Sequence, residues 1–292
     1  SDLINKEGKA EMGVAVGCDS RSNSRLFAET AARVLAANGI KVHLFPEIEP
    51  TPVLSFAVRE LHCIAGINIT ASHNPKQYNG YKAYWDDGAQ LPPDHAKTVS
   101  EFIAAADIFD DVKMITLDEG IKSGLITYIG NDLIETYLSK VIAEAVNPDV
   151  IAKVADDLKI VYTPLHGTGR VLVPEVLKRV GLKHIYPVEE QMIPDGNFPT
   201  VSFPNPEYPA VFELGIKLAE KIGSDLIIAT DPDADRMGIM SRDKTGKFVC
   251  LTGNQVGALL LDYIIKAYET TGMPENPYAV KTIVTTEIVT EI

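Results

Sequence analysis

Hydrophobic positions along this chain fall into two alternating patterns. Residues 13–18 form a short continuous apolar run, which is typical of a buried strand, whereas residues 26–37 repeat apolar side chains every three or four positions, as an amphipathic helix does. The helical pattern closes at Asn38-Gly39, a common helix stop, and residues 41–45 are the next apolar run. The order strand, helix, strand predicts an α/β architecture.

The same order recurs in the second half of the chain. The segments concerned are residues 159–163 (strand), 171–180 (helix), 184–188 (strand) and 225–229 (strand). The recurrence lies in the pattern of apolar positions rather than in a repeated sequence. The predicted fold class is therefore α/β, with repeated three-layer α/β domains and mixed, mainly parallel sheets.

Breaks in these patterns predict three domains. Residues 107–122 are acid-rich and weakly periodic, and residues 127–146 are expected to form a helix that enters a second unit. Residues 254–268 have clear amphipathic spacing, and a last strand is expected over residues 278–286. The predicted domains are residues 1–125, 126–248 and 249–292, and the third is expected to be only the start of a longer domain.

Composition narrows the class of protein. The chain has 292 residues, 46% of them hydrophobic and 23% charged, and a formal net charge of −13. An acidic surface argues against a nucleic-acid partner, which clustered Lys and Arg would hold. Cys18, Cys63 and Cys250 show no metal-ligand spacing, and we expect free thiols in a reducing, cytoplasmic setting. The longest apolar stretch, residues 256–265, is too short to span a membrane, so no membrane partner is expected.

A serine loop is the first candidate for chemistry. An apolar run at residues 66–71 ends at Ser72, followed by His73 and Pro75, with Lys82 a few positions later. A serine hydroxyl can carry a group covalently when a base or cation supports it, and His73 and Lys82 are candidates for that support. The alternative is a surface turn rich in Ser, Asn and Pro.

An acidic loop is the second candidate. Asp231, Asp233 and Asp235 alternate directly after an apolar run, and Arg236 follows them. Three carboxylates can converge on one cation if the loop curls, and all-oxygen ligation suits Mg²⁺. A solvated acidic turn is the alternative, although close carboxylates repel one another unless they are neutralised. A calcium EF-hand is excluded, because the sixth and twelfth positions, which would be Gly and Glu, are Arg236 and Arg242.

A glycine-containing turn, residues 166–170, lies between a predicted strand and helix. It could present main-chain N–H groups to an anion. It lacks the third glycine of a dinucleotide fingerprint, and a plain tight turn is the simpler interpretation.

A softer feature is Asp19-Ser20-Arg21, which also follows an apolar run and has Arg25 close by. Arg21 could point toward the region of Ser72, because ligands gather at the carboxyl ends of strands in open α/β sheets. Ordinary surface charge is the alternative.

The order of these motifs resembles the α-D-phosphohexomutases, the phosphoglucomutase and phosphomannomutase family. The resemblance rests on Gly-Cys-Asp-Ser-Arg at 17–21, Thr-Ala-Ser-His-Asn-Pro at 70–75, Asn-Gly-Tyr-Lys at 79–82 and Asp-Pro-Asp-Ala-Asp-Arg at 231–236. The sequence of residues 76–85 is most similar to that of the branch that holds phosphoglucomutases and phosphopentomutases. The resemblance covers essentially the whole chain.

This resemblance implies an isomerase that moves phosphate between two positions of a hexose phosphate, glucose above all, through a phosphoserine and a bisphosphorylated sugar. It implies that Ser72 is the phosphorylated residue, that Lys82 and His73 assist proton transfer, and that Arg21 and Arg236 lie near phosphate. It also implies Mg²⁺ bound by Asp231, Asp233, Asp235 and the phosphate on Ser72, with glucose 1,6-bisphosphate or the matching sugar bisphosphate as activator.

Departures from the family pattern also shape the expectations. The family's early Thr/Ser-Gly-Leu/Ile-Arg-Gly loop, its sugar-recognition loop and its phosphate-binding fourth domain have no counterpart here, so the chain is expected to be an N-terminal fragment of about two-thirds that is inactive alone. Mannose or a pentose phosphate is an alternative substrate within the family. More distant alternatives are an aspartyl-type phosphatase and a non-catalytic mutase-like binding protein. The oligomeric state stays open.

Overall fold

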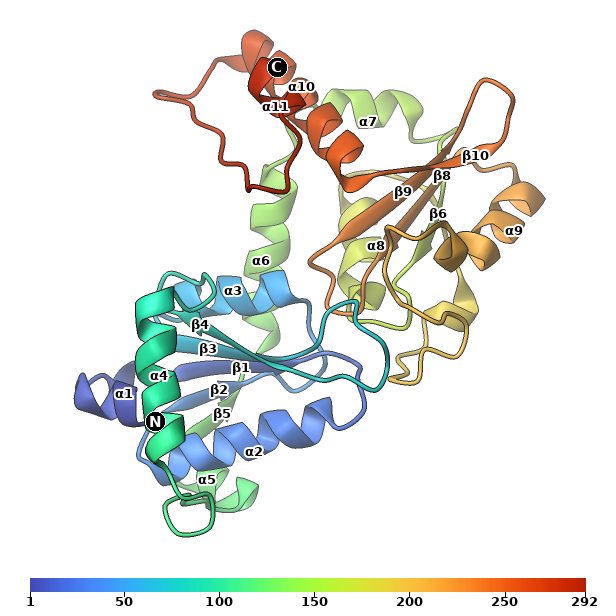
Figure 1. Cartoon of the computed structure of the whole chain (residues 1–292). Coiled ribbons are helices and arrows are strands. Elements are labelled where there is room, and N and C mark those ends of the chain that lie inside the picture. Colours follow the sequence, from blue (N-terminus) through green and yellow to red (C-terminus); the bar gives the residue numbers. More distant parts are fainter.

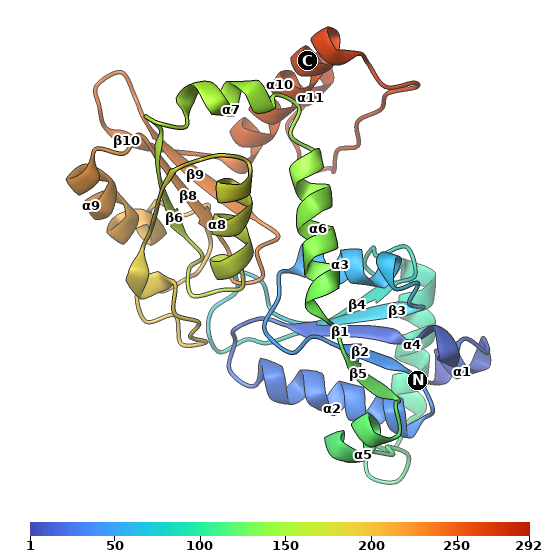
Figure 2. The ribbon, with the colours of Figure 1, turned by 180° about the vertical axis from the view of Figure 1, so that it is seen from behind.

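Two α/β units lie side by side in the computed structural model, which describes all 292 residues (Figures 1 and 2). The first unit is built on a five-stranded sheet with strand order β4-β3-β1-β2-β5. Its strands are β1 (Val14–Cys18), β2 (Val42–Leu44), β3 (Ala65–Ile69), β4 (Tyr81–Trp85) and β5 (Ile126–Tyr128). All pairs are parallel except β3 with β4, which is antiparallel and closes one edge.

Helices cover both faces of this first sheet. They are α1 (Asp2–Lys6), η1 (Ala10–Met12), α2 (Ser24–Ala37), α3 (Thr51–Glu60), α4 (Pro93–Ala105) and α5 (Leu117–Lys122). The helix α2 packs on β1, β2 and β3 from one side, and α3 packs on β1 and β3 from the other. The result is a three-layer unit, as the alternating pattern predicted.

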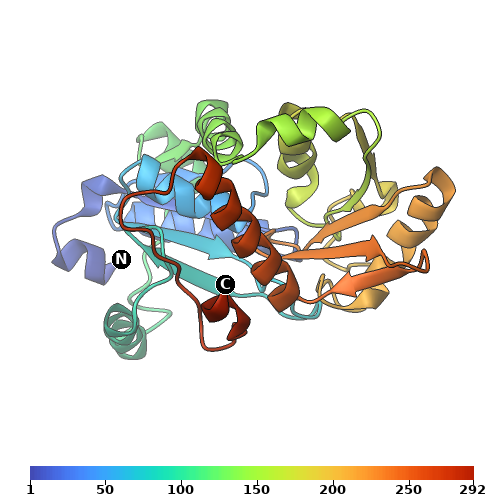
Figure 3. The ribbon, with the colours of Figure 1, turned by 90° about the horizontal axis from the view of Figure 1, so that it is seen from above.

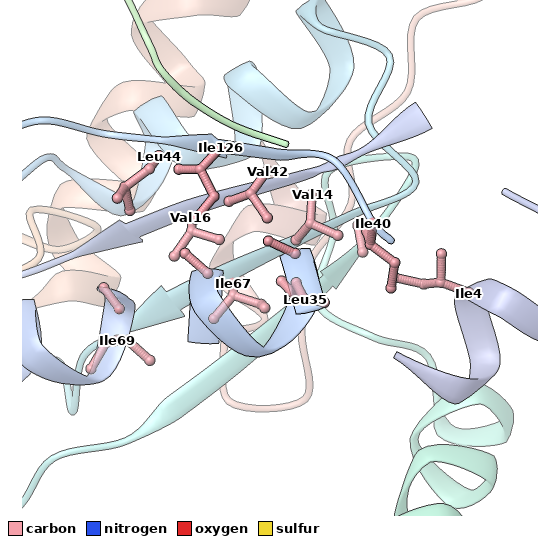
Figure 4. Packing of buried hydrophobic residues seen from close by; sticks show 14 of the residues in the cluster. Ile4, Val14, Val16, Leu35, Ile40, Val42, Leu44, Ile67, Ile69 and Ile126 are labelled. Atoms are coloured by element: carbon pink, nitrogen blue, oxygen red, sulfur yellow. The ribbon is translucent and has the colours of Figure 1, made fainter. Parts of the chain in front are cut away.

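The core of the first unit lies between α2 and the sheet (Figure 4). Val14 and Val16 of β1, Ile67 of β3 and Leu35 of α2 are all almost completely buried there. Each such side chain contributes roughly 1.5–3 kcal/mol when removed from water. On the other face, Gly66 lets α3 come close, because a Cβ at this position would lie 2.6 Å from Val58. These contacts hold β3, and therefore the loop that follows it, in place.

The second unit repeats the plan with strand order β10-β9-β8-β6-β7. Its strands are β6 (Lys159–Thr163), β7 (His184–Pro187), β8 (Leu226–Thr230), β9 (Met237–Arg242) and β10 (Phe248–Leu251). The strands β6, β7 and β8 are parallel, whereas β9 and β10 add antiparallel pairs. The flanking helices are α8 (Gly169–Arg179), η2 (Glu189–Gln191), η3 (Pro209–Phe212) and α9 (Glu213–Ile222). The sheets are mixed, as predicted, and the fold class is confirmed.

Helices also join and extend the two units. The helix α6 (Asn131–Ala143) packs against α3 of the first unit and α8 of the second, and α7 (Pro148–Val154) leads into β6. The helix α10 (Gly253–Thr271) begins at a capping box made by Thr252 and Gln255. It then contacts α11 (Ile288–Glu291), and Figure 3 shows the two together with the C-terminus.

Two expected elements differ from the structure. The helix expected over residues 127–146 starts later, because Ile126–Tyr128 forms β5 and pairs with β2 in the first sheet. We therefore propose to move the boundary of the first domain from residue 125 to a point between β5 and α6. The strand expected at residues 278–286 is wrong: this segment is an exposed connection without β pairing. Apolar residues favour a strand only where a neighbouring strand satisfies the main-chain hydrogen bonds.

None of the helices combines the length and the apolar character needed to cross a bilayer. Cys18 and Cys63 are buried and Cys250 is partly buried, and all three thiols are free, as expected.

Candidate active site

Ser72 is held in an unusual main-chain conformation just after β3. Its φ is 53°, in the left-handed region that few non-glycine residues adopt, and only 8% of its surface is exposed. Its N–H donates to the Thr70 hydroxyl at 2.8 Å, and that hydroxyl donates to Asp19 Oδ2 at 2.7 Å. Such strain persists where surrounding contacts enforce it, and it recurs at functional sites.

The Ser72 hydroxyl points at the second unit. Ser72 Oγ donates to Asp231 Oδ2 at 2.8 Å, although the two residues are 159 positions apart in sequence. His73 Nδ1 lies 3.2 Å from Ser72 Oγ. Burial, followed by the nearby Arg236 cation, lowers the pKa of His73, which favours the neutral imidazole that can exchange a proton with Ser72.

The acidic loop curls as the alternating carboxylates predicted. Asp231 follows β8 directly, and Ala234 takes a left-handed φ of 52° that turns the loop. Asp231, Asp233 and Asp235 can each place one carboxylate oxygen within 4.8 Å of the other two. Asp233 Oδ1 is buried and accepts no hydrogen bond, which is the arrangement expected of an oxygen reserved for a cation. All-oxygen donors of this kind fit Mg²⁺.

The carboxylates perturb one another strongly. Burial, and then the charges of Asp233 and Asp235, raise the pKa of Asp231. For Asp233, burial disfavours ionisation, but the positive charge of Lys82 and the hydrogen bonds from Lys82 and Thr51 act against it, and the net effect is a lowered pKa. Two acids with opposite shifts in one loop indicate a site that gains from added positive charge.

Lys82 supplies part of that charge from the first unit. It lies on the edge strand β4, and its Nζ is 3.0 Å from Asp233 Oδ2 and 3.5 Å from Asp235 Oδ2. Burial lowers the pKa of Lys82, but the two carboxylates act against it more strongly and the net shift is upward. In this arrangement Lys82 is an ammonium that neutralises the acidic loop.

Arg236 and Arg21 were both predicted near phosphate, and their surroundings differ. Arg236 donates its main-chain N–H to Asp231 Oδ1 at 3.0 Å, while its exposed guanidinium makes no protein hydrogen bond and is free to meet an anion. Arg21 is only 3% exposed, and its terminal nitrogens already donate to four carbonyls of residues 72–78. A phosphate contact by Arg21 does not match this geometry, because no terminal N–H is left for it.

The turn at residues 166–170 supports the acidic loop rather than an open anion site. The N–H of Thr168 donates to the Pro232 carbonyl at 2.8 Å, and a Cβ at Gly167 would lie 2.4 Å from Pro232 Cα. The His166 side chain contacts the Ile193 carbonyl and the Thr200 hydroxyl. The tight-turn interpretation is the one that fits, and the glycine is needed for close approach.

Sequence reasoning missed Thr51, which begins α3. Its N–H donates to the Asp233 carbonyl at 2.8 Å and its hydroxyl to Asp233 Oδ2 at 2.9 Å. Asn68 of β3 in turn donates to that hydroxyl at 2.7 Å. The available signal was the Pro-Thr-Pro sequence at residues 50–52, which follows the carboxyl end of the strand predicted at 41–45.

A serine hydroxyl that faces three carboxylates and a lysine across two α/β units is an arrangement that can support phosphoryl transfer, in which charge neutralisation dominates. Comparison with known proteins identifies the family. The family models of phosphoglucomutase/phosphomannomutase α/β/α domains I and II match residues 2–108 and 135–246. The chain belongs to the phosphoglucomutase/phosphomannomutase family, as the motifs indicated.

Individual relatives carry the names of the same family. The chain is 39% identical to a phosphoglucomutase of Staphylococcus saprophyticus over 95% of this chain and 49% of that protein. It is 36% identical to a probable phosphomannomutase of Haemophilus influenzae over 89% of this chain and 52% of that one. The crystal structure of a putative phosphomannomutase from Thermus thermophilus matches with a TM-score of 0.73 and 28% identity, over 91% of this chain and 55% of that one. The chain thus spans about half the length of the curated relatives it matches, less than the two-thirds that the motifs led us to expect.

Proposed function

We propose that this chain carries the phosphoserine and metal-binding parts of a hexose-phosphate mutase, with Ser72 as the phosphoryl carrier. The observation that carries the proposal is the 2.8 Å hydrogen bond from Ser72 Oγ to Asp231 Oδ2, which joins the two candidate loops into one site. It supports a mutase over an aspartyl phosphatase, because the latter leaves the strained Ser72 loop without a role.

The proposed reaction begins with a phosphate on Ser72. The sugar hydroxyl oxygen bonds to phosphorus as the bond from phosphorus to Ser72 Oγ breaks, and the hydroxyl proton ends on Ser72 Oγ. The product is a sugar bisphosphate, which turns round. Ser72 Oγ then bonds to the phosphorus of the other phosphate as the bond from that phosphorus to the sugar oxygen breaks, and the Ser72 proton ends on the sugar oxygen. Positioning and charge neutralisation supply most of the rate enhancement in such transfers.

Three side chains have proposed roles beside Ser72. His73, with Nδ1 3.2 Å from Ser72 Oγ, exchanges the proton that moves between the sugar hydroxyl and the serine. Lys82, an ammonium paired with Asp233 and Asp235, assists this transfer as a proton donor. The exposed guanidinium of Arg236 holds phosphate oxygens, for which its fork of donors is suited. The distance to Ser72 Oγ supports the role of His73, and contacts with the acidic loop support the roles of Lys82 and Arg236.

Mg²⁺ is the proposed metal, held by Asp231, Asp233, Asp235 and the phosphate on Ser72. When bound, it neutralises charge on the phosphate oxygens and polarises the phosphorus. The buried and unpartnered Asp233 Oδ1 supports this assignment from within the protein.

Glucose is the proposed sugar, since the relative at 39% identity is named phosphoglucomutase. Mannose is the alternative, because the relative at 36% identity is named a probable phosphomannomutase. Glucose 1,6-bisphosphate is the proposed activator, because it can deliver the first phosphoryl group to Ser72.

The test is an assay of the full-length protein with glucose 1-phosphate, Mg²⁺ and a catalytic amount of glucose 1,6-bisphosphate. Wild type should form glucose 6-phosphate, and Ser72→Ala should lose at least about 1,000-fold in rate, as loss of a covalent carrier would. Ser100→Ala, on the exposed face of α4, is the control and should keep full activity. Release of inorganic phosphate by wild type and Ser72→Ala alike would instead favour the phosphatase. Faster turnover of mannose 1-phosphate than of glucose 1-phosphate would identify mannose as the preferred sugar.

A further inference from the structure

Arg21 makes an unusual set of contacts with the loop that carries Ser72. Its Nη1 donates to the carbonyls of Pro75 and Tyr78 at 2.9 Å each. Its Nη2 donates to the carbonyl of Ser72 at 2.7 Å and to that of Asn74. Four N–H groups on one rigid plane therefore bind four carbonyls of one loop. A flexible loop of this length could not keep its carbonyls converged on one point without such a partner.

The Arg21 guanidinium is itself paired with a buried carboxylate, that of Asp19. Arg21 Nε lies 3.3 Å from Asp19 Oδ2, and both side chains are completely buried. The Asp19 carboxylate also accepts hydrogen bonds from Ser24 at 2.8 Å and from Thr70 at 2.7 Å, and the Thr70 hydroxyl in turn receives the N–H of Ser72. A continuous network thus connects Arg21 to both the carbonyl and the N–H of Ser72.

Residues of the second unit also pack against the Arg21 guanidinium and its main chain. The ring of Phe198, which is 2% exposed, lies with its centroid 5.1 Å from the Arg21 guanidinium carbon. Gly196 approaches so closely that a Cβ there would lie 2.3 Å from the main-chain nitrogen of Ser22. The loop that contains Gly196 and Phe198 therefore seals the side of Arg21 that the Ser72 loop leaves open, and it excludes water from these hydrogen bonds.

We propose that Arg21 is a positioning residue for Ser72, and that Phe198 of the second unit completes it. The fork of Arg21 sets the left-handed conformation of Ser72, with φ of 53°, and so aims Ser72 Oγ at Asp231 in the other unit. Arg21 acts through the geometry of its donors and does not touch phosphate. This proposal rests on the proposed role of Ser72, but the loop geometry can be measured separately from the reaction.

The first experiment uses hydrogen exchange on this 292-residue chain. Arg21→Lys keeps the charge opposite Asp19 but loses the planar fork, so the amides of residues 72–80 should exchange at least tenfold faster than in wild type. Arg33→Lys is the matched control, because Arg33 also donates to a carbonyl, that of Ile115, far from Ser72. Wild-type protection of the loop in Arg21→Lys would overturn the proposal.

A second variant guards against a folding failure. Phe198→Leu keeps the four hydrogen bonds but removes the ring, and it should accelerate exchange of the same amides by a smaller factor, about threefold or more. If this variant leaves the loop unchanged, Phe198 has no part in the positioning. Global unfolding of both variants would assign these residues to fold stability and would also overturn the proposal.

The second experiment measures kinetics in the full-length protein. A positioning role predicts that Arg21→Lys lowers kcat by about 100-fold with little change in KM, since misplacement of about 1 Å has an effect of this size. A phosphate-binding role predicts the reverse: Arg21→Lys should raise KM and keep most of kcat, because Lys still carries the charge that attracts phosphate. If Ser72→Ala keeps its activity, the proposed function fails, whereas the exchange result on Arg21 stands by itself.

Discussion

Two residues of the first unit contact Asp233 in the acidic loop. Lys82 pairs with its Oδ2 at 3.0 Å, and Thr51 donates to the same oxygen at 2.9 Å. These contacts occupy one carboxylate oxygen and leave Oδ1 buried without a hydrogen-bond partner. Residues that orient a metal ligand typically affect metal affinity by about 10–100-fold.

Replacing Thr51 by Val should therefore weaken metal binding without unfolding the protein. The methyl group keeps the volume, but Asp233 Oδ2 loses its hydroxyl donor and Asn68 loses its acceptor. We expect a loss of about tenfold in Mg²⁺ affinity, measured by titration calorimetry on this chain. Thr98→Val, on exposed α4, is the control. Equal affinities for Thr51→Val and wild type would show that the hydroxyl does not orient Asp233.

At the scale of elements, loops at the carboxyl ends of β1, β2, β3 and β8 supply the site. They contribute Arg21, Thr51, Ser72 and the three aspartates respectively. Parallel strands bring the first three residues to one edge of the first sheet, and the aspartates follow a strand of the second sheet. The connection between β2 and α3 carries one more ionisable group, Glu49. Its N–H donates to the Cys18 carbonyl, and its side chain is partly buried.

Glu49 should make stability depend on pH. Burial, and then the charge of Glu47, raise the pKa of Glu49 from 4.5 to about 7. Because the folded pKa lies above the unfolded one, this group favours folding below about pH 4.5, and that contribution is lost as pH rises through 7. The ionised side chain then costs up to about 2 kcal/mol, allowing for its partial exposure.

The measurement compares urea unfolding of wild type and Glu49→Gln at pH 5 and pH 8. Glu49→Gln should gain stability relative to wild type between these two pH values, since Gln has no charge to bury. Glu101→Gln, at an exposed position of α4, is the control for general charge effects. A difference between Glu49→Gln and wild type that is the same at both pH values would refute the assignment.

At the scale of the whole molecule, the candidate site belongs to neither unit alone. Ser72 and Lys82 come from the first sheet and the aspartates from the second, and all are joined by direct contacts. The helix α6 lies between the units and contacts a helix in each (Figure 2). A cation that binds the aspartates should therefore stabilise the assembled pair of units.

Mg²⁺ at 100 times its dissociation constant should stabilise the folded chain by about 2.7 kcal/mol. For a chain of this size that corresponds to a rise of roughly 4–5 °C in Tm, measured by scanning calorimetry with EDTA as the reference. The variant with Asp231, Asp233 and Asp235 all changed to Asn should show no rise. A rise of similar size in the triple variant would place the cation elsewhere on this acidic protein.

The sequence by itself determined the elements and the two main loops of this protein. Apolar runs and helical spacing are local patterns, so they indicated β1, α2, β6, α8 and α10, and the motifs around Ser72 and Asp231 indicated the family. Each of these signals lies within a few consecutive residues, where backbone propensity and burial act together.

Only the tertiary structure decided what depends on distant partners. The donors of Arg21 meet carbonyls more than 50 positions away, and Thr51 meets Asp233 across 182 positions. Residues 278–286, apolar enough to predict a strand, have no strand beside them in the fold and stay in an exposed connection. In each case the outcome is set by hydrogen-bond partners that folding brings together, which no local pattern records.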